Sequence, residues 1–577
     1  MPNLKLETLD RFKSFTPKGD LFGGVTTAIV SLPLALAFGV ASGAGAEAGL
    51  WGAILVGLFA ALFGGSSSLI SEPTGPMTVI MTAVLTSMMA QYPEQGYAMA
   101  FTVVMMAGAF QILIGMLKLG KYVTLMPYSV VSGFMSGIGV ILITLQLAPL
   151  MGQAAPPGGV SGTLQSLPSI LMNLHFPELF LGLLTLSILF LMPAAWRKLC
   201  PPQLVALVAV TLLSVALFET DQIRRIGEIP SSLPSFVIPT FSPEMLTAMV
   251  IDAMALGTLG CIDTLLTAVI ADSLTRKEHD SDKELRGQGI ANLVAGMFGA
   301  LPGAGATMGT VVNVQVGARS PVSGVLRALI LLAVVLVAGG LTEPIPMAVL
   351  AGIAVYVGFN ILDWSFLQRA HKLSLSQTFI MYGVMGLTVF VDLIVAVGLG
   401  VFISNIIVIE RLSRVQEDTI KAISDSDNDV PLSPVEREML DRANGKVLLF
   451  YLSGPMIFSV SKAIARQHQR AGNYQAMLLD LSDVNFLGVS SGLALENAIV
   501  EALDTGAQVF VLCPNAGARD RMDQMGISDR VGRENFVTSR IEGLTRALDS
   551  TGASTLPENN RQPRSTRPGI DEDFDVG

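Results

Sequence analysis

Apolar stretches of similar length recur along residues 20–411, separated by short polar connections that carry most of the charge of this region. An α-helix needs about 20 predominantly apolar residues to cross the hydrocarbon core of a bilayer. Many of these stretches approach that length. The pattern predicts about fourteen membrane segments, at approximately 20–43, 49–65, 74–88, 98–117, 123–150, 178–195, 203–219, 245–272, 288–302, 307–317, 320–340, 345–361, 376–391 and 393–411.

The third and tenth segments, 74–88 and 307–317, are too short to cross as full helices. "SEPTGPM" introduces the third, and "LPGAGAT" introduces the tenth. A helix break in lipid leaves backbone groups unsatisfied unless protein or a water-filled cavity satisfies them, so each break is a packed kink or a binding site. Each segment is third in a run of seven. Paired breaks at corresponding positions of two halves indicate a transporter's substrate site.

After Arg414 the pattern changes to short apolar strands that alternate with amphipathic helices. "KVLLFYLSGPMIF", "QAMLLDLSDV" and "AQVFVLCPN" are the strands, and the alternation predicts a small α/β domain. The predicted organisation is a cytoplasmic N-terminal segment at 1–19, a transmembrane domain at 20–411, a linker at 412–440, the α/β domain at 441–550 and a disordered tail at 551–577.

Composition agrees with a polytopic membrane protein, since 51% of the 577 residues are hydrophobic and only 14% are charged. The net charge of −10 is concentrated in the C-terminal part, and nothing in it suggests a nucleic-acid partner. The three cysteines have no disulfide or metal-site spacing. Lysines and arginines fall on one side of the predicted segments, with Arg224 and Arg225 as the main exceptions. The positive-inside rule therefore predicts that both termini are cytoplasmic.

The two short segments predict an anion-binding site, which is called the anion seat below. An odd number of spans per repeat inverts the repeats, so the half-helices would enter from opposite sides with their N-termini facing each other. Each helix N-terminus carries about +0.5 of an elementary charge and free N–H groups. Two of them favour a small, monovalent oxyanion. Thr74 and Thr307 would add hydroxyl donors, and Gly75, Gly305 and Ala306 would let the anion approach the backbone.

Asp263 lies near the middle of the eighth segment, where an ionisable residue is costly and indicates function. Thr267 follows it by four residues on the same helix face. Together with backbone carbonyls near Gly305, these oxygens suit a small cation such as Na⁺. A structural hydrogen bond or ion pair is the alternative, and a protonated Asp263 would leave H⁺ coupling open. For three other acidic residues we expect structural or surface roles, with Glu72 structural, Asp20 a helix N-cap and Asp272 solvated.

The run "DLFGGVTTAIVSLPLALAFGVASGAGAEAGL", the broken "SEPTGPMTV" and "PGAGATMGTVVNV" together resemble the sulfate permease (SulP) family of anion transporters. The C-terminal part resembles the STAS domain of that family. Within the family, "AFGVASGAGAEAGL" and "ISEPTGPMTV" resemble the cyanobacterial sodium-dependent bicarbonate transporters. The resemblance implies a seven-plus-seven inverted repeat. It also implies a core of segments 1–4 and 8–11 that moves like an elevator against a gate of segments 5–7 and 12–14.

The resemblance also implies two sets of ligands. It places bicarbonate at Thr74, Ala306 and Thr307, and sodium at Asp263, Thr267, Gly305 and Thr307. Two departures from many family members favour a cation-coupled carrier over an exchanger. Leu34 replaces a common glutamine after Pro33, and the tenth segment has no basic residue at its start.

In related STAS domains a serine can be phosphorylated, and here "DLSDVNFLGVSSG" makes Ser490 or Ser491 the candidate. The alternative is that these serines cap the following helix. From the resemblance we expect the domain to regulate the carrier or to hold a homodimer together.

The leading interpretation is a secondary carrier that takes up bicarbonate together with Na⁺ across the inner (plasma) membrane, with no cofactor beyond the coupling ion. A SulP carrier of sulfate or a dicarboxylate, with H⁺ coupling open, is the nearest alternative. A membrane sensor that signals through the STAS domain is an alternative of another class. An enzyme is disfavoured, because Thr74, Asp263 and Thr307 form no nucleophile–base pair and no histidine lies near them in the sequence.

Overall fold

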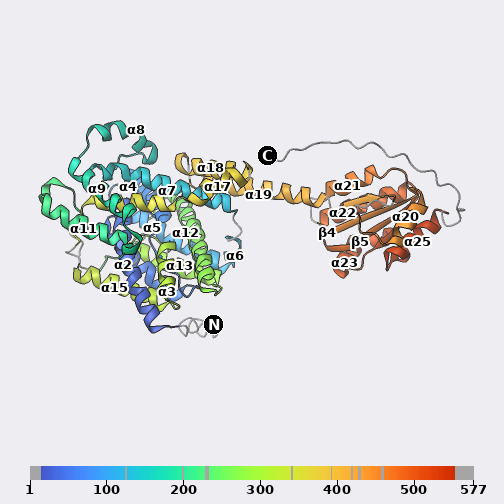
Figure 1. Ribbon diagram of the computed structural model, residues 1–577, viewed down its shortest axis with the longest axis horizontal. Coiled ribbons are helices and arrows are strands. Elements are labelled where there is room, and N and C mark those ends of the chain that lie inside the picture. Colours follow the sequence, from blue (N-terminus) through green and yellow to red (C-terminus); the bar gives the residue numbers. More distant parts are fainter. Residues whose placement is uncertain are drawn as a thin grey trace. The chain divides into compact units, whose positions relative to one another are not determined.

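The computed structural model of the chain consists of two compact units, Met1–Ser404 and Asn405–Gly577, which are described separately (Figure 1). The described residues are 15–123, 127–197, 200–227, 233–338, 342–373, 375–391, 393–417, 420–425, 430–456 and 461–552. The first fourteen residues of the predicted N-terminal segment, and the predicted tail from 553 onward, lie outside the described residues.

The first unit is helical, and each predicted membrane segment overlaps a helix. The helices are α2 (Pro17–Ala41), α3 (Ala46–Phe63), α4 (Gly75–Gln91), α5 (Gly96–Met116), α6 (Gly120–Val123), α7 (Tyr128–Leu150), α8 (Gly159–Met172), α9 (Phe176–Leu191), α10 (Ala194–Arg197), α11 (Pro202–Leu217), α12 (Leu246–Thr275), α13 (Ser281–Met297), α14 (Thr307–Gln315), α15 (Val322–Ala338), α16 (Met347–Ile361), α17 (Trp364–Leu373), α18 (Leu375–Phe390) and α19 (Leu393–Glu417). The last helix, α19, continues past Ser404 into the second unit.

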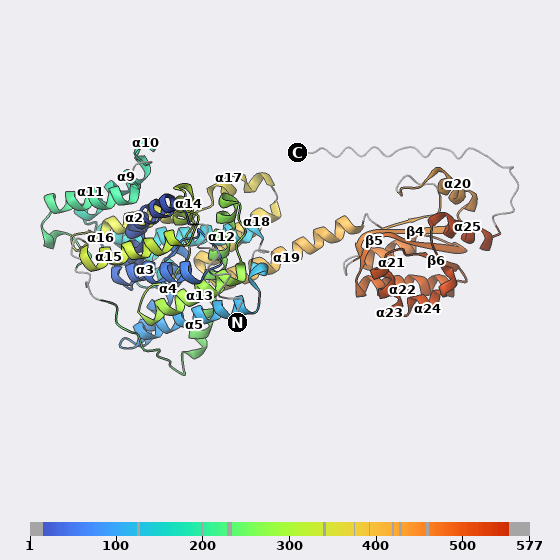
Figure 2. The same ribbon diagram turned by 90° about the horizontal axis from the view of Figure 1, so that it is seen from below.

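Five of these helices, α2, α3, α5, α7 and α12, are individually long and apolar enough to cross a membrane. The pair α8 and α9 is bent by 117° at its break, and α11, α15, α16 and α18 are shorter apolar helices. In the bundle, α13 packs against α5 and α3, while α15 packs against α2 and α3. Figure 2 shows α2, α15, α3, α13 and α5 in successive rows.

Two helix starts differ from the sequence-based expectation. The ninth segment was predicted from residue 288, but α13 begins at Ser281 because the carboxylate of Asp280 accepts a hydrogen bond from the Lys283 N–H at 3.0 Å. Asp20 is not the N-cap that we predicted. It lies inside α2, and its Oδ1 accepts hydrogen bonds from the backbone N–H groups of Arg319 and Ser320, both at 2.9 Å. Asp20 thus joins α2 to the residues just before α15.

Both predicted breaks are present, and they pair with each other. The extended residues β1 (Ser71–Glu72) precede α4, and β2 (Ala304–Gly305) precedes α14. The two strands are antiparallel, with Ser71 opposite Gly305 and Glu72 opposite Ala304. This pair of strands is called the crossing below. Because antiparallel strands run in opposite directions, α4 and α14 extend from the crossing in opposite directions, and both begin next to it.

Side chains of α13 satisfy the backbone of the second break. The C=O of Gly303 accepts hydrogen bonds from Gln288 Nε2 at 2.8 Å and from Asn292 Nδ2 at 3.0 Å. The N–H of Gly303 donates to Asn292 Oδ1 at 2.8 Å. Asn292 Nδ2 also donates to Gln111 Oε1 on α5, at 2.8 Å. The break is therefore held by a buried polar network, as an interruption at membrane depth requires.

The second unit contains a five-stranded sheet in the order β3-β4-β5-β6-β7, in which β3 is antiparallel to β4 and the other pairs are parallel. Helices α21–α24 cover one face and α20 and α25 cover the other (Figure 2). The elements are β3 (Ile420–Ile423), α20 (Pro434–Ala443), β4 (Val447–Met456), α21 (Ser461–Arg470), β5 (Ala476–Leu487), α22 (Val489–Asp504), β6 (Gln508–Leu512), α23 (Ala516–Gln524), α24 (Ile527–Val531), β7 (Phe536–Val537) and α25 (Arg540–Ser550).

The predicted linker at 412–440 was wrong for part of its length. Residues Ile420–Ile423 form the edge strand β3, which pairs with Leu449–Leu452 of β4. Residues from Pro434 onward form α20, whose start is fixed by a reciprocal cap between Ser433 and Glu436. The α/β unit therefore includes residues well before 441. An edge strand of four residues has too short an apolar pattern to stand out in the sequence.

Candidate functional site

The middle of α12 contacts the start of α4. Thr74 is the residue before α4 and has an extended backbone, and its side chain does not cap its own helix. Its hydroxyl instead donates a hydrogen bond to Asp263 Oδ2 at 2.8 Å, and both side chains are buried. The structure therefore brings together a residue predicted for the anion and one predicted for the cation.

One helical turn further along, α12 contacts the start of α14. The hydroxyl of Thr267 donates to the C=O of Gly305 at 2.9 Å and lies 3.0 Å from Thr307 Oγ1. Thr264, which the sequence reasoning missed, accepts a hydrogen bond from the N–H of Gly305 at 3.1 Å. Its position next to Asp263, in "DTLLT", was the available signal. A single turn of α12 thus connects the two half-helices.

The helix starts at this place offer hydrogen-bond donors. Pro76 has no N–H, so α4 presents the amides of Gly75 and Met77 from its first turn. The first turn of α14, which starts at Thr307, also lacks intrahelical acceptors for its amides. The N–H of Ala306 is already used, because it donates to the C=O of Ile70 at 2.8 Å. The amide of Ala306, one of the residues predicted for the anion, is therefore not free to donate to a ligand.

Exposure differs among the site residues. Thr74, Asp263, Thr267, Gly305 and Ala306 are buried, whereas Thr307 is exposed. Among the residues that the structure describes, no lysine, arginine or histidine forms an ion pair with Asp263. A buried carboxylate without a cation is costly, so this carboxylate either binds a cation or is protonated.

The start of α4 also lies close to two further helices, α16 and α7. A Cβ added at Gly75 would lie 2.5 Å from Ile361 Cδ1, at the end of α16, and 3.6 Å from Leu142 Cδ2, on α7. A larger residue at this position would require the end of the Ile361 side chain to move. The half-helix start therefore contacts α7 and α16 as well as α12.

A buried ion pair lies next to the crossing, and its basic partner was not identified from the sequence. Arg327, on α15, is fully buried and forms an ion pair with Glu72 in β1. The sequence reasoning gave Glu72 a structural role but looked for a basic residue only in the tenth segment. A single arginine inside the apolar run "VLRALILLAVV" of the following segment was the signal that it overlooked.

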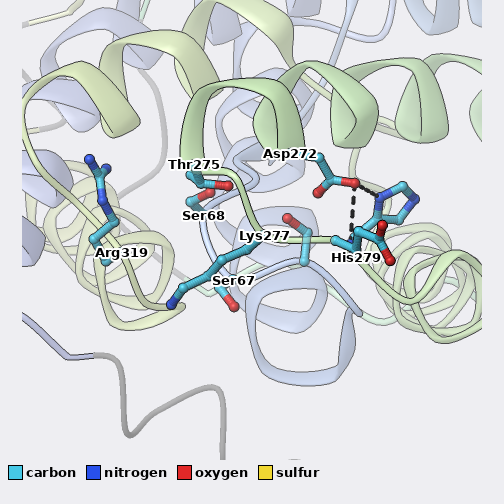
Figure 3. A pocket seen from close by; sticks show the side chains of 9 residues that line it. Ser67, Ser68, Asp272, Thr275, Lys277, His279 and Arg319 are labelled. Carbon is cyan, nitrogen blue, oxygen red and sulfur yellow. Dashed lines mark hydrogen bonds and ion pairs between the residues drawn. The ribbon is translucent and has the colours of Figure 1, made fainter.

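A separate polar pocket lies at the C-terminal end of α12 (Figure 3). The Asp272 carboxylate is 2.6 Å from Nδ1 of His279, and Nε2 of that ring is 3.0 Å from Ser281 Oγ. The expectation that Asp272 is solvated was wrong, because it is only 23% exposed and is paired with His279. Arg319 lines the opposite side of the pocket in this view. The pocket lies at the end of α12, and Asp272 is nine residues beyond Asp263 in the sequence.

In the α/β unit, the two candidate phosphorylation sites differ in accessibility. Gly488 is the N-cap of α22, so neither serine caps the helix and that alternative was wrong. Ser490 is exposed in the first turn, whereas Ser491 is fully buried. On the face of the sheet that α20 and α25 cover, burial and a 2.5 Å hydrogen bond to Asp483 raise the pKa of Tyr451 to about 12.

Comparison with known proteins identifies the architecture. The model of the Sulfate permease family matches residues 18–384, and that of the STAS domain matches residues 439–541. The chain belongs to the sulfate permease family. It is 57% identical over 535 residues to the "Bicarbonate transporter BicA" of Picosynechococcus sp., covering 92% of this chain and 94% of that protein. This confirms the resemblance inferred from the sequence.

Solved structures agree with this assignment. The transmembrane domain of a cyanobacterium bicarbonate transporter BicA matches with a TM-score of 0.64 and 60% identity, covering 66% of this chain and 97% of that one. Murine Solute Carrier 26 family member A9, an anion transporter in the inward-facing state, matches with a TM-score of 0.80 over 94% of each chain. At 19% identity the second likeness concerns the fold alone. The chain is therefore a multi-pass membrane transporter with a C-terminal STAS domain.

Proposed function

We propose that this carrier takes up bicarbonate together with Na⁺, as a symporter. The observation that carries the proposal is the buried carboxylate of Asp263, which accepts a hydrogen bond from Thr74 at the start of α4 and has no basic ion-pair partner among the described residues. It lies on the same turn of α12 that contacts the start of α14 through Thr264 and Thr267. The 57% identity to a protein named as a bicarbonate transporter supports the choice of anion.

The proposed sodium site consists of hard oxygen ligands. The Thr267 hydroxyl, the Gly305 C=O and the Thr307 hydroxyl form a chain of contacts at 2.9 and 3.0 Å. With the carboxylate of Asp263, on the same helix as Thr267, they would offer one negative and three neutral oxygens, the ligand type that small hard cations prefer. Na⁺ bound here would neutralise Asp263.

The proposed bicarbonate seat uses the two helix starts. Each N-terminus contributes about half a positive charge, so the pair balances one monovalent anion when Na⁺ has neutralised Asp263. Thr74, Ala306 and Thr307 would surround the anion, with amides of α4 and α14 as donors. A dianion such as sulfate would leave an excess negative charge beside Asp263, unless a second cation entered.

We further propose that transport proceeds by an elevator-like movement. The close approach of Gly75 to Ile361 on α16 and to Leu142 on α7 supports this proposal, because both helices belong to the gate in the proposed seven-plus-seven arrangement. We place both termini in the cytoplasm and the carrier in the inner (plasma) membrane, because of the distribution of basic residues. We also propose that the STAS domain holds a homodimer.

The test is uptake of labelled bicarbonate into proteoliposomes at fixed pH, with an inward gradient of Na⁺ or of choline. We expect uptake only with Na⁺, and no Na⁺-dependent uptake by Asp263→Asn. Asp272→Asn is the matched control, because it makes the same change on the same helix but outside the site. Wild-type rates in Asp263→Asn would overturn the sodium site. Uptake that is indifferent to Na⁺ would overturn sodium coupling. Binding without flux would favour a sensor.

A further inference from the structure

The guanidinium of Arg327 connects α15 to α2, to β1 and, through the C=O of Ala53 at 3.4 Å, to α3. Its Nε donates to Ser31 Oγ on α2 at 2.8 Å, and its Nη1 donates to the C=O of Ser71 in β1 at 3.1 Å. Its Nη2 donates to Glu72 Oε2. The fold leaves room for this side chain, because a Cβ added at Gly57 on α3 would lie only 2.4 Å from Arg327 Nη1.

The other oxygen of Glu72 faces the start of α14. A Cβ added at Gly309, in the first turn of that helix, would lie 3.3 Å from Glu72 Oε1. Glu72 is also only two residues before Thr74, and it is paired in register with Ala304. A carboxylate at this position lies next to the helix end that would attract the anion. If it were uncompensated, its negative charge would offset the partial positive charge of that end.

Stability alone gives a weak reason for such a pair. Replacing a buried ion pair by well-packed apolar residues is often neutral or stabilising, whereas removing one partner is strongly destabilising. The pair Glu72–Arg327 is among the most buried in the described part of the chain, with side-chain exposures of 4% and 0%. Its place beside both half-helices points to a role in the site.

We propose that Arg327 is a positioning residue that neutralises Glu72, so that the start of α14 keeps its positive potential for the anion. This inference rests on the proposed function, since it takes a small anion as the occupant of the seat. Arg327 does not contact the anion in this proposal. It acts through Glu72, and through the β1 backbone that leads to Thr74.

Substitutions of the two partners should then shift the affinity for bicarbonate in opposite directions. Arg327→Met leaves the negative charge of Glu72 uncompensated, and we expect KM for bicarbonate to rise roughly tenfold, as for a unit charge beside a helix end. Half-saturation by Na⁺ should stay the same or fall. Glu72→Gln leaves a positive charge, so KM for bicarbonate should fall and half-saturation by Na⁺ should rise. The double variant Arg327→Met/Glu72→Gln should bring both values back towards wild type.

The assay is the proteoliposome uptake described above, with initial rates normalised to the amount of reconstituted protein. A purely structural role predicts fewer active molecules, or a rise of both constants, in both single variants, and either result would overturn the proposal. A double variant as poor as Arg327→Met would also overturn it, because that result means that Arg327 contacts the anion directly.

Two further measurements keep the test decisive. Arg327→Lys retains the charge and loses the forked contacts, so KM for bicarbonate should stay close to wild type even where Arg327→Met fails to fold. A tenfold rise in Arg327→Lys would contradict charge compensation. Failure of the proposed function would appear separately, as wild-type uptake that does not depend on Na⁺ or does not carry bicarbonate.

Discussion

The polar network that holds the second break makes a quantitative prediction for Asn292→Ala. Asn292 is fully buried on α13, where it both donates to and accepts from the backbone of Gly303 and also donates to Gln111 Oε1. Alanine removes all of these bonds. The C=O of Gly303 keeps Gln288 as a donor, but the N–H of Gly303 and Oε1 of Gln111 lose the partners described above.

Two buried polar groups would then be unsatisfied, and each costs about 1–3 kcal/mol. The free energy of unfolding should therefore fall by about 2–6 kcal/mol. With an unfolding entropy of about 2.1 cal/mol/K per residue, a unit of about 400 residues shifts its unfolding midpoint by roughly 1.2 °C per kcal/mol, so we expect a fall of about 2–7 °C. The loss should also reduce uptake, since Gly303 leads directly into β2 and α14.

The assay is thermal unfolding of the detergent-purified, full-length protein. Asn173→Ala is the matched control, because Asn173 is exposed at the end of α8 and its side chain donates to Ser169 within the same helical turn. We expect the control to stay within about 0.5 kcal/mol of wild type, as exposed substitutions usually do. If Asn292→Ala and Asn173→Ala unfold at the same temperature, the network does not support the break and the reasoning is refuted.

Two predictions concern the STAS domain. Ser490→Asp places a negative charge in the exposed first turn of α22 and should leave the unfolding midpoint unchanged or raise it slightly, whereas Ser491→Asp buries a charge and should lower it clearly. Equal midpoints would remove the distinction between the two serines as phosphorylation sites. The pKa of Tyr451 is raised from 10.0 to about 12, so the folded state holds this proton more tightly than the unfolded state. Its contribution to stability is complete below pH 10 and is lost between pH 10 and about 12, and stability curves against pH should lack this component in Tyr451→Phe.

The sequence predicted the elements of the site because their signals are local. Prolines and glycines mark the breaks, and the spacing of Asp263 and Thr267 places both on one helix face. The structure then brings Thr74 to Asp263, and Thr267 to Gly305 and Thr307. Their roles as ligands of bicarbonate and Na⁺ stay predictions.

What the sequence did not reveal depends on contacts between distant parts of the chain. Asp20 has the composition of a helix cap, and only the folded chain shows that it binds residues 319 and 320. Arg327 appears in the sequence as one charge in an apolar helix, with nothing nearby that names Glu72 as its partner. Thr264 looks like any helical threonine until the Gly305 N–H is placed beside it. Periodicity cannot specify such pairs, because it describes one element at a time.

The ion pair between Glu72 and Arg327 limits how early the protein can complete its folding during synthesis. The partners are 255 residues apart. At about 5–20 residues per second, the ribosome adds Arg327 roughly 13–50 s after Glu72. During that interval Arg327 is not available to pair with Glu72, and for most of it β1 has no β2 to pair with, since residues 304–305 are made shortly before Arg327. The first segments can enter the membrane early, but they reach their final packing only when the eleventh arrives. Insertion and folding of this carrier are therefore separate events in time.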